Sequence, residues 1–321
     1  MIALSAADVL GLLEPAETVA LAESAALAAA ASSGSVVPAR THLRFAQGTL
    51  LTMPAIDAGA MAVKLVSVVP GNAARDLPVT NGVLLLSSAE TGLPLAIMDA
   101  AALTAMRTGA VGALGLKYTT PPEVASLGIV GAGVQGVWQA ITACAVRPIR
   151  EVFALRRSAA GFERFRATLA AHAPGITVTA CASVAQVLER TRVIVTATTS
   201  AEPVLPDEPA LLEGRHFIAI GSYERHMCEL PDAALALAGR LVLDSEFARH
   251  EVGEAVRALE RGILADADVF TVDELAAGRR SLDVTRTTAY KSAGMALYDL
   301  AVARALHAAA VRRAVGQEVS L

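Results

Sequence analysis

The sequence predicts an α/β fold in which a doubly wound parallel sheet is inserted in a second, discontinuous α+β domain. From Glu123 onward, short apolar runs alternate with helical tracts, which is the pattern of parallel strands joined by crossover helices. The first of these runs breaks at closely spaced glycines and turns into a helix. The chain before it shows short β-like runs separated by turn residues, and an Ala-rich tract closes the sequence.

The composition excludes several classes of protein. The chain has 321 residues, enough for two domains, and its formal net charge is −4. It contains no basic run or aromatic-rich basic patch, so we expect no nucleic-acid partner. The three cysteines form no CxxC motif and the histidines no HExxH spacing, so we expect no disulfides and no metal. The first residues lack the pattern of a signal peptide, and we expect a soluble cytoplasmic protein without a membrane span.

The first 118 residues predict a mixed domain. A short helix over 5–13 and a second helix, which follows Pro15 and ends near Ser32-Ser33-Gly34, precede the β-like runs. Glycines, prolines and asparagines separate those runs, as in an antiparallel sheet. The expected strands cover 42–45, 49–53, 60–69 and 83–87, and a helix over 101–118 ends before Pro121-Pro122.

Residues 119–294 predict the parallel sheet. The expected strands cover 126–130, 151–155, 176–180, 193–198, 216–221 and 240–244, with helices that include 161–171, 183–190 and 246–261. A final Ala-rich helix over 292–312 resembles the helices of the first part. We therefore expect a first domain made of residues 1–118 and 295–321, with the dinucleotide-binding domain between them.

The stretch Gly131-x-Gly133-x-x-Gly136 indicates a dinucleotide-binding turn. It follows the apolar run 126–130 and leads into a helical tract over 137–146. The first N–H groups of a helix lack partners and lie at its positive end, which suits a pyrophosphate. The glycines alone are a weak motif, and the strand before them and the helix after them give it weight.

The tip of the next strand favours NADPH over NADH. NAD-binding units usually carry an Asp or Glu there, about 20 residues after the glycines, to bind the ribose hydroxyls. This chain has Arg156-Arg157-Ser158 instead. A carboxylate would repel a 2′-phosphate, whereas guanidinium groups bind phosphate through paired charge-assisted hydrogen bonds. We expect NADPH as the cofactor with NADH as the alternative, and the competing interpretation is that these charges are simply solvated.

Three cations, Arg40, Lys64 and Arg107, stand in apolar or small-residue surroundings. Lys64 interrupts the apolar run 61–68, and no carboxylate lies beside any of the three in the sequence. A lone cation on an apolar strand is usually a surface residue whose charged end reaches water. Three of them could instead converge on the carboxylate of a small substrate, with arginine giving bidentate contact and lysine a point charge.

Several motifs occur together and in order along nearly the whole chain. The most specific is Leu103-Thr104-Ala105-Met106-Arg107-Thr108-Gly109-Ala110, beside Gly131-Ala132-Gly133-Val134-Gln135. Others are Pro38-Ala39-Arg40-Thr41, Met53-Pro54-Ala55, Lys64-Leu65-Val66, Cys228-Glu229-Leu230 and Val242-Leu243-Asp244-Ser245. This set resembles the ornithine cyclodeaminase/μ-crystallin family.

The resemblance implies a Rossmann domain inserted in a discontinuous substrate-binding and dimerisation domain, and hence a homodimer. It implies that Arg40, Lys64 and Arg107 hold the substrate carboxylate and its neighbourhood, and we take these three as the catalytic residues. The cofactor-binding positions that we expect are Gly131, Gly133, Val134, Gln135, Arg156, Arg157, Ser158, Thr198, Ile220, Thr80, Thr108 and Ser292.

One loop departs from the cyclodeaminase pattern Gly-x-Asp-x-Pro-Gly-Lys-x-Glu-Leu. Tyr223 stands where cyclodeaminases carry the Asp that acts as acid and base, and Met227 stands where they carry the Lys. The resemblance therefore favours the reductase branch, which uses NADPH to reduce Δ1-pyrroline-2-carboxylate or Δ1-piperideine-2-carboxylate to L-proline or L-pipecolate. The alternatives are an ornithine cyclodeaminase, an open-chain amino-acid dehydrogenase of the alanine type, and an NADPH-binding crystallin-like protein without turnover.

The proton donor stays open at this point. A protonated iminium bound from solution needs little general-acid work, whereas a neutral imine requires a donor. The candidates are Lys64 and a water molecule ordered by Tyr223 or Glu224.

Overall fold

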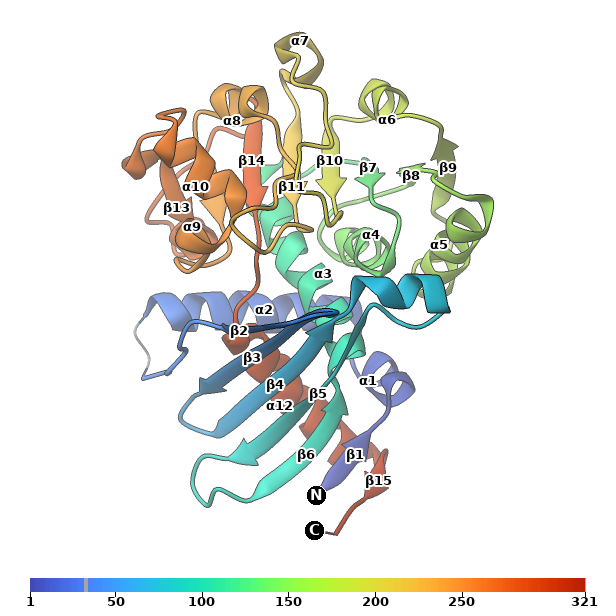
Figure 1. Cartoon of the computed structure of the whole chain (residues 1–321), viewed down its shortest axis with the longest axis vertical. Helices are drawn as coiled ribbons and strands as arrows, with labels where there is room; N and C mark the ends of the chain where they lie inside the picture. The colour runs from blue at the N-terminus through green and yellow to red at the C-terminus, as the bar shows by residue number, and fades with distance from the viewer. Residues whose placement is uncertain (32–33, 321) are drawn as a thin grey trace. The chain divides into compact units, whose positions relative to one another are not determined.

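The structure, a computed structural model, describes residues 1–31 and 34–320 and divides into two compact units (Figure 1). The first unit comprises Met1–Arg107 and Met295–Leu321, and the second comprises Thr108–Gly294. One division falls after Gly294, and the other lies between Arg107 and Thr108, inside a long helix. No helix of the described residues is both long and apolar enough to span a bilayer.

Within the described residues, seven strands of the first unit form one mixed sheet in the order β15-β1-β6-β5-β4-β3-β2. The strands are β1 (Ile2–Leu4), β2 (Thr41–Phe45), β3 (Gly48–Ile56), β4 (Ala60–Val68), β5 (Thr80–Ser88), β6 (Pro94–Asp99) and β15 (Gln317–Glu318). β2 to β5 pair antiparallel, as predicted, and β6 extends this arrangement by pairing antiparallel with β5. β1 runs parallel to β6. The sequence did not predict β1, β6 and β15, because β1 and β15 are very short and β6 runs without a turn into the next helix.

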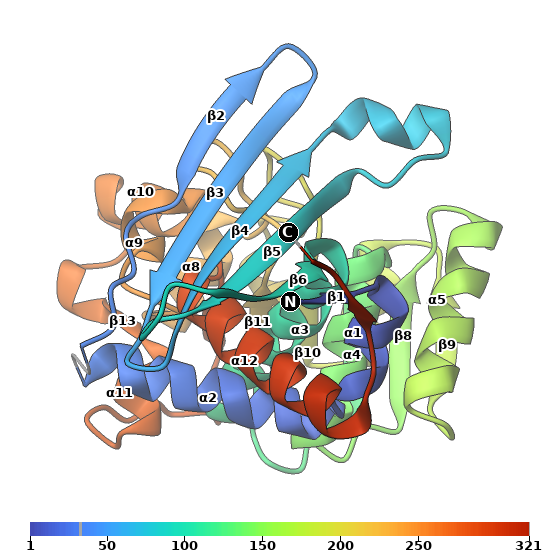
Figure 2. The same ribbon diagram turned by 90° about the horizontal axis from the view of Figure 1, so that it is seen from below.

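The helices of the first unit are α1 (Ala6–Leu12), α2 (Pro15–Ala30), the beginning of α3 (Ala100–Thr119) and α12 (Ala296–Arg313), with a 3-10 turn, η1 (Pro70–Arg75). α2 and α12 lie side by side (Figure 2), and α12 packs on β3 and β4. The predicted end of the second helix, Ser32-Ser33, lies outside the described residues. β4 alternates between buried and exposed side chains, so one face of the sheet is the core of this unit.

The second unit contains a sheet in the order β13-β12-β14-β11-β10-β7-β8-β9, and every neighbouring pair is parallel. The strands are β7 (Ser126–Val130), β8 (Glu151–Leu155), β9 (Thr177–Cys181), β10 (Val193–Thr196), β11 (His216–Ala219), β12 (Leu241–Leu243), β13 (Val269–Thr271) and β14 (Thr288–Lys291). The chain moves outward from β7 to β9 and then returns to place β10 beside β7. This reversal is the mark of a doubly wound sheet, which confirms the predicted fold class.

The helices of the second unit are α4 (Val134–Val146), α5 (Ala159–His172), α6 (Val184–Arg190), α7 (Pro209–Leu212), α8 (Asp232–Ala238), α9 (Ala248–Glu251), α10 (Gly253–Glu260) and α11 (Val272–Ala276), with a 3-10 turn, η2 (Asp266–Asp268). The helix predicted over 246–261 is wrong in one respect, because the chain breaks at Val252 into α9 and α10. The sequence also did not predict β13 and β14, and β14 lies between β11 and β12 inside the sheet.

Candidate functional site

Two of the three predicted cations meet at a buried carboxylate in the first unit. Lys64 Nζ lies 2.8 Å from each oxygen of Asp299. Arg107 Nε lies 2.9 Å from Asp299 Oδ1, although its N–H forms no aligned hydrogen bond within the described residues. The side chains of Lys64, Arg107 and Asp299 are 2%, 6% and 1% exposed, so all three charges are held away from bulk water.

Three different elements bring these side chains together. Lys64 lies on the buried face of β4, between Ala62 and Val66, and that face packs against α12. Asp299 is in the first turn of α12, where a negative charge is favoured by the helix dipole. Arg107 follows two turns after the start of α3, which the carboxylate of Asp99 caps by accepting a hydrogen bond from the backbone N–H of Ala102.

The charges and the burial of this cluster lower the pKa of Lys64 into the physiological pH range. Burial is the main cause that lowers the pKa of Lys64 to about 7, and the positive charge of Arg107 lowers it further. Asp299 opposes both effects, and the positive charge of Arg40 adds the smallest of the lowering contributions. Two cations, Lys64 and Arg107, contact one carboxylate, which leaves an excess of positive charge that suits a bound carboxylate.

The sequence did not predict Asp299. It stands 235 residues from Lys64 along the chain, so local inspection of either residue cannot pair them. The available signal was the single carboxylate in the otherwise apolar stretch 296–303, at a position that a buried helix does not normally give to Asp.

The predicted glycine loop lies in the second unit, between β7 and α4. Gly131 has a φ of +110°, and a Cβ added there would lie 2.5 Å from the carbonyl oxygen of Ala197. A Cβ at Gly133 would meet open space, and α4 starts directly after it without a side-chain cap among the described residues. The first N–H groups of α4 therefore face a space that an anion can enter.

Most predicted cofactor residues share one edge of the parallel sheet. Gly131 to Gln135 form the loop after β7 and the start of α4. The segments that follow the carboxyl ends of β8, β10, β11 and β14 carry Arg156 to Ser158, Thr198, Ile220 and Ser292, respectively. This is the edge at which doubly wound sheets bind ligands. Thr80 begins β5 in the first unit and Thr108 is the first residue of the second, so neither unit contains both.

The tip of β8 offers two cations and a hydroxyl. Arg156 and Arg157 are exposed. Ser158 is the N-cap of α5, and its Oγ accepts a hydrogen bond of 3.1 Å from the backbone N–H of Gly161. A hydroxyl that accepts one hydrogen bond can still donate another, so the tip retains the donors that a phosphate group requires.

Two of the predicted cofactor residues use their hydroxyls inside the protein. Thr198 Oγ1 donates to Glu229 Oε1 at 2.8 Å, and Ser292 Oγ donates to Asp244 Oδ2 at 2.7 Å. Both carboxylates are buried and neither was predicted as part of the site. These two hydroxyls therefore have no proton to spare for a ligand.

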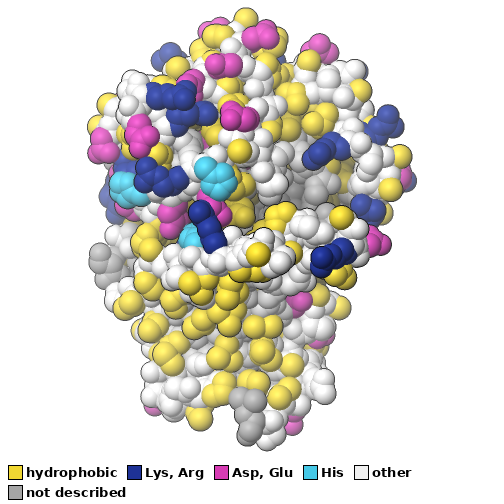
Figure 3. Space-filling view, in the orientation of Figure 1, with side chains coloured by type: hydrophobic (Ala, Val, Ile, Leu, Met, Phe, Trp, Pro, Cys, Tyr) yellow, Lys and Arg dark blue, Asp and Glu magenta, His cyan; other side chains and the backbone are white. Residues whose placement is uncertain are grey.

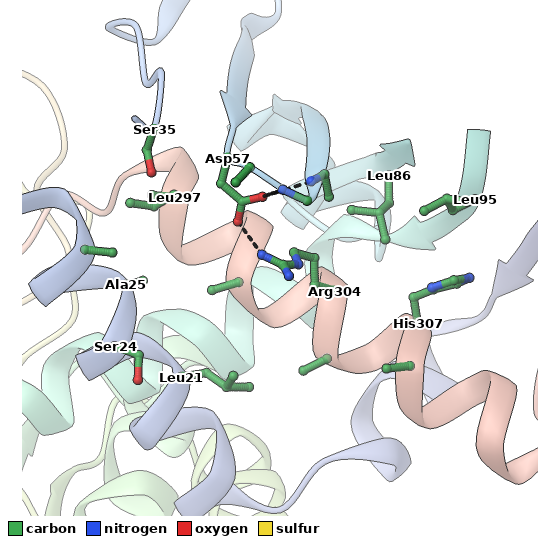
Figure 4. Close-up of a pocket in the computed structure, with 17 residues that line it drawn as sticks. Leu21, Ser24, Ala25, Ser35, Asp57, Leu86, Leu95, Leu297, Arg304 and His307 are labelled. Atoms are coloured by element: carbon green, nitrogen blue, oxygen red, sulfur yellow. Dashed lines mark hydrogen bonds and ion pairs between the residues drawn. The ribbon is translucent and has the colours of Figure 1, made fainter. Parts of the chain in front are cut away.

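A separate hollow of about 870 Å³ lies in the first unit, between α2, α12 and the sheet (Figure 4). Small side chains line most of it, and the charged pair Arg304–Asp57 spans its wall. Arg304 is neutralised by Asp57, and neither Lys64 nor Arg107 lines the hollow. The hollow thus has space but no concentration of charge, and the cluster around Lys64 is the candidate site.

Comparison with known proteins gives a match along the whole chain. The model of the ornithine cyclodeaminase/mu-crystallin family matches residues 2–313. A Delta(1)-pyrroline-2-carboxylate reductase of Bacillus cereus is 33% identical over 294 residues, which are 88% of this chain and 89% of that protein. The ketimine reductase mu-crystallin of Mus musculus is 32% identical and covers 85% of this chain and 82% of its own.

Two solved structures share the fold over their full length. A Thermococcus litoralis Delta(1)-pyrroline-2-carboxylate reductase in complex with NADH and L-proline superposes with a TM-score of 0.92 and 30% identity, covering 99% of this chain and 100% of that one. A dimer of an archaeal alanine dehydrogenase with bound NAD has a TM-score of 0.89 and 30% identity, covering 100% and 99% of the two chains.

Proposed function

Because the chain belongs to the ornithine cyclodeaminase/mu-crystallin family and is an NAD(P)H-dependent oxidoreductase, we propose that it reduces a small cyclic imino acid. The substrate is Δ1-pyrroline-2-carboxylate or Δ1-piperideine-2-carboxylate, and the product is L-proline or L-pipecolate. The observation that carries the proposal is the buried cluster of Lys64, Arg107 and Asp299, with Arg40 acting on it. It offers positive charge for a carboxylate and a lysine that titrates near neutral pH.

In the proposed reaction, the side chains of the protein bind the substrate carboxylate and supply a proton. When bound, the reduced nicotinamide supplies a hydride for the carbon of the C=N bond. Arg107 and Arg40 hold the substrate carboxylate, because guanidinium groups match its two oxygens. Protonated Lys64 either donates a proton to the imine nitrogen or adds positive charge beside an iminium that is already protonated. Its lowered pKa makes that proton easier to transfer than an ordinary ammonium proton.

A substrate panel tests the proposed activity. Oxidation of NADPH, followed by its absorbance, is expected to be most efficient with the two cyclic imino acids, judged by kcat/KM. Ornithine with NAD should release no ammonia, because Tyr223 replaces the acidic residue of the cyclodeaminases. Ammonia release from ornithine, or no oxidation with either imino acid, would overturn the proposal.

A second candidate function comes from the likeness to the archaeal alanine dehydrogenase. Such an enzyme would reduce the imine formed from pyruvate and ammonia, which also carries its carboxylate next to the C=N carbon. The same cationic cluster could hold it. In the panel, this function predicts a higher kcat/KM for pyruvate with ammonia than for the cyclic imino acids.

The strand tip at Arg156-Arg157-Ser158 supports a preference for NADPH. Changing Arg157 to Ala should raise the KM for NADPH by about tenfold, since a charge-assisted hydrogen bond contributes about 1.5–3 kcal/mol. The KM for NADH should stay unchanged, because NADH has no 2′-phosphate. Initial rates with both cofactors measure the effect, and Arg166→Ala is the matched control, since Arg166 is an exposed arginine of α5 paired with Glu163. A tenfold preference of the unchanged enzyme for NADH would contradict the assignment.

The outer face of the first unit's sheet supports a homodimer. Val63, Leu65, Val83 and Leu85 are 39–41% exposed in the single chain and pair across β4 and β5, on the face opposite Lys64. Hydrophobic side chains gather over this sheet (Figure 3). An apolar patch on a folded chain usually marks an interface, and the solved alanine dehydrogenase is a dimer.

Leu65→Asp should therefore give a monomer of 33.0 kDa, whereas the unchanged protein should have twice that mass. A charge placed in the centre of an apolar interface loses its hydration without gaining a partner. Light scattering after size exclusion measures the mass. Leu93→Asp, at a more exposed leucine in the turn before β6, is the control and should stay dimeric. A monomeric unchanged protein would refute the homodimer.

A further inference from the structure

Glu229 is fully buried and accepts hydrogen bonds from two loops that follow neighbouring strands. Its Oε1 accepts from the backbone N–H of Thr198 at 2.7 Å and from the Thr198 hydroxyl at 2.8 Å. Its Oε2 accepts from the backbone N–H groups of Gly221 at 2.6 Å and Ser222 at 3.3 Å. Thr198 follows β10, and Gly221 and Ser222 follow β11. One carboxyl group therefore fixes the distance between these two loops.

The backbones of these loops are in close contact, so the loops have no room to move closer together. A Cβ on Gly221 would lie 1.9 Å from the carbonyl oxygen of Thr198, and only backbone stands in its way. On the other side, a Cβ on Gly131 would lie 2.5 Å from the carbonyl oxygen of Ala197. The loops after β7, β10 and β11 thus touch backbone to backbone, and a small shift of one displaces the next.

The burial of Glu229 beside a second carboxylate makes its negative charge energetically unfavourable. Glu254 of α10 is also buried, and its Oε1 accepts from the backbone N–H of Glu229 at 2.7 Å while both its oxygens lie 2.8 Å from the Ser222 hydroxyl. Lys291, at the end of β14, is the buried cation that offsets these charges. Burial raises the pKa of Glu229, and Lys291 opposes the rise. Apolar side chains often replace such buried charges without loss of stability.

The position of the two loops in the sheet indicates what they serve. In a doubly wound sheet a dinucleotide crosses the switch point, with one nucleotide half over the first three strands and the other over the strands beyond. Here β9, β8 and β7 carry the glycine loop and the arginine tip, and β10, β11 and β14 lie beyond the switch. The loops held by Glu229 therefore belong to the nicotinamide half.

We propose that Glu229 is a positioning residue that holds the Thr198 and Gly221 loops in the arrangement that receives the nicotinamide half of the cofactor. The inference rests on the proposed use of NAD(P)H. In this role, loss of Glu229 weakens the binding of the nicotinamide half of the cofactor and not that of the adenosine half. A purely structural role would affect the binding of both halves equally.

The test compares NADPH with 2′-phospho-ADP-ribose, which lacks the nicotinamide, in calorimetric titrations. Glu229→Gln keeps the size but can accept on one oxygen only, so its amide NH₂ faces the N–H of Thr198 or of Gly221. We expect the Kd of NADPH to rise about tenfold or more and that of 2′-phospho-ADP-ribose to change less than about twofold. Gly221→Ala, which forces the loops apart and leaves Glu229 intact, should give the same selective loss and serves if Glu229→Gln does not fold.

Thr191→Val is the matched control. Thr191 is buried before the opposite end of β10 and exchanges hydrogen bonds of 3.0 Å with Ser126. This variant should lower Tm and leave the ratio of the two Kd values unchanged. Equal weakening of both ligands by Glu229→Gln, or no weakening of either, would overturn the role of Glu229. If the unchanged protein bound neither NADPH nor NADH, the proposed function itself would fail.

Discussion

Changing Arg107 to Ala is expected to lower kcat/KM for the cyclic imino acid by about a hundredfold, because truncating one member of a buried charge pair costs about 2–5 kcal/mol. Arg107 is the guanidinium next to Lys64 and Asp299, and its loss removes the bidentate partner of the substrate carboxylate. Lys64 and Asp299 still neutralise each other, so the fold should be retained. The Kd of NADPH should not change. Steady-state kinetics and a cofactor titration measure the two quantities.

Arg304→Ala is the matched control for this experiment. Arg304 belongs to the same unit and is also paired with an aspartate, Asp57, but its side chain is 49% exposed. Surface pairs of this kind contribute about 0–1 kcal/mol. Turnover of the Arg304 variant should be near normal. Near-normal turnover of the Arg107 variant as well would refute a carboxylate clamp at this cluster.

Changing Asp299 to Asn is expected to move the pH profile of kcat/KM to lower pH. Lys64 acts in its protonated form, so activity should fall as the pH rises through its pKa of about 7. Asp299 raises that pKa by favouring the charged ammonium, and Asn removes this contribution. In the Asp299 variant, kcat/KM should therefore begin to fall at a lower pH than in the unchanged enzyme. Titration of the free substrate imine could also produce a falling limb, but a substitution in the protein cannot change the pKa of the free substrate. A shift of the limb in the Asp299 variant therefore assigns the limb to a group of the protein.

The same substitution should destabilise the first unit. It leaves Lys64 and Arg107 as buried cations without their carboxylate, which typically costs about 3–5 kcal/mol. Urea unfolding measures this loss. Asp57→Asn, which weakens the pair with the half-exposed Arg304, should leave the limb in place and cost less than the change at Asp299. A limb that stays in place in the Asp299 variant would exclude Lys64 as the titrating group.

The doubly wound sheet could be predicted because its signals are local. A glycine loop between a strand and a helix, and apolar runs at regular spacing, are visible within short windows. β14 was missed because four buried residues, Thr288–Lys291, between loops carry no periodic pattern of their own. The break at Val252 was missed although Val252 and Gly253 are weak helix formers, because the helical tracts on either side were taken as one continuous helix.

The site was predictable only where a residue conflicts with its own neighbourhood. Lys64 in an apolar strand and the run Arg156-Arg157 at a strand tip stand out in the sequence. Asp299 also stands out as the single carboxylate of an apolar stretch, but its partner Lys64 is distant in the chain and becomes a neighbour only through the packing of α12. The partners of Glu229 likewise come together only at the strand ends. The sequence alone indicated Lys64 and Arg107, but not the carboxylate of Asp299 that pairs with both and raises the pKa of Lys64.

The most direct test of the proposed reaction follows the hydride itself. The enzyme is given the cyclic imino acid and NADPH that carries deuterium at both C4 positions, and the product is examined by mass spectrometry and NMR. We expect L-proline or L-pipecolate with one deuterium on the carbon that bears the carboxylate. A product without deuterium at that carbon, or bound cofactor without any amino-acid product, would contradict imine reduction.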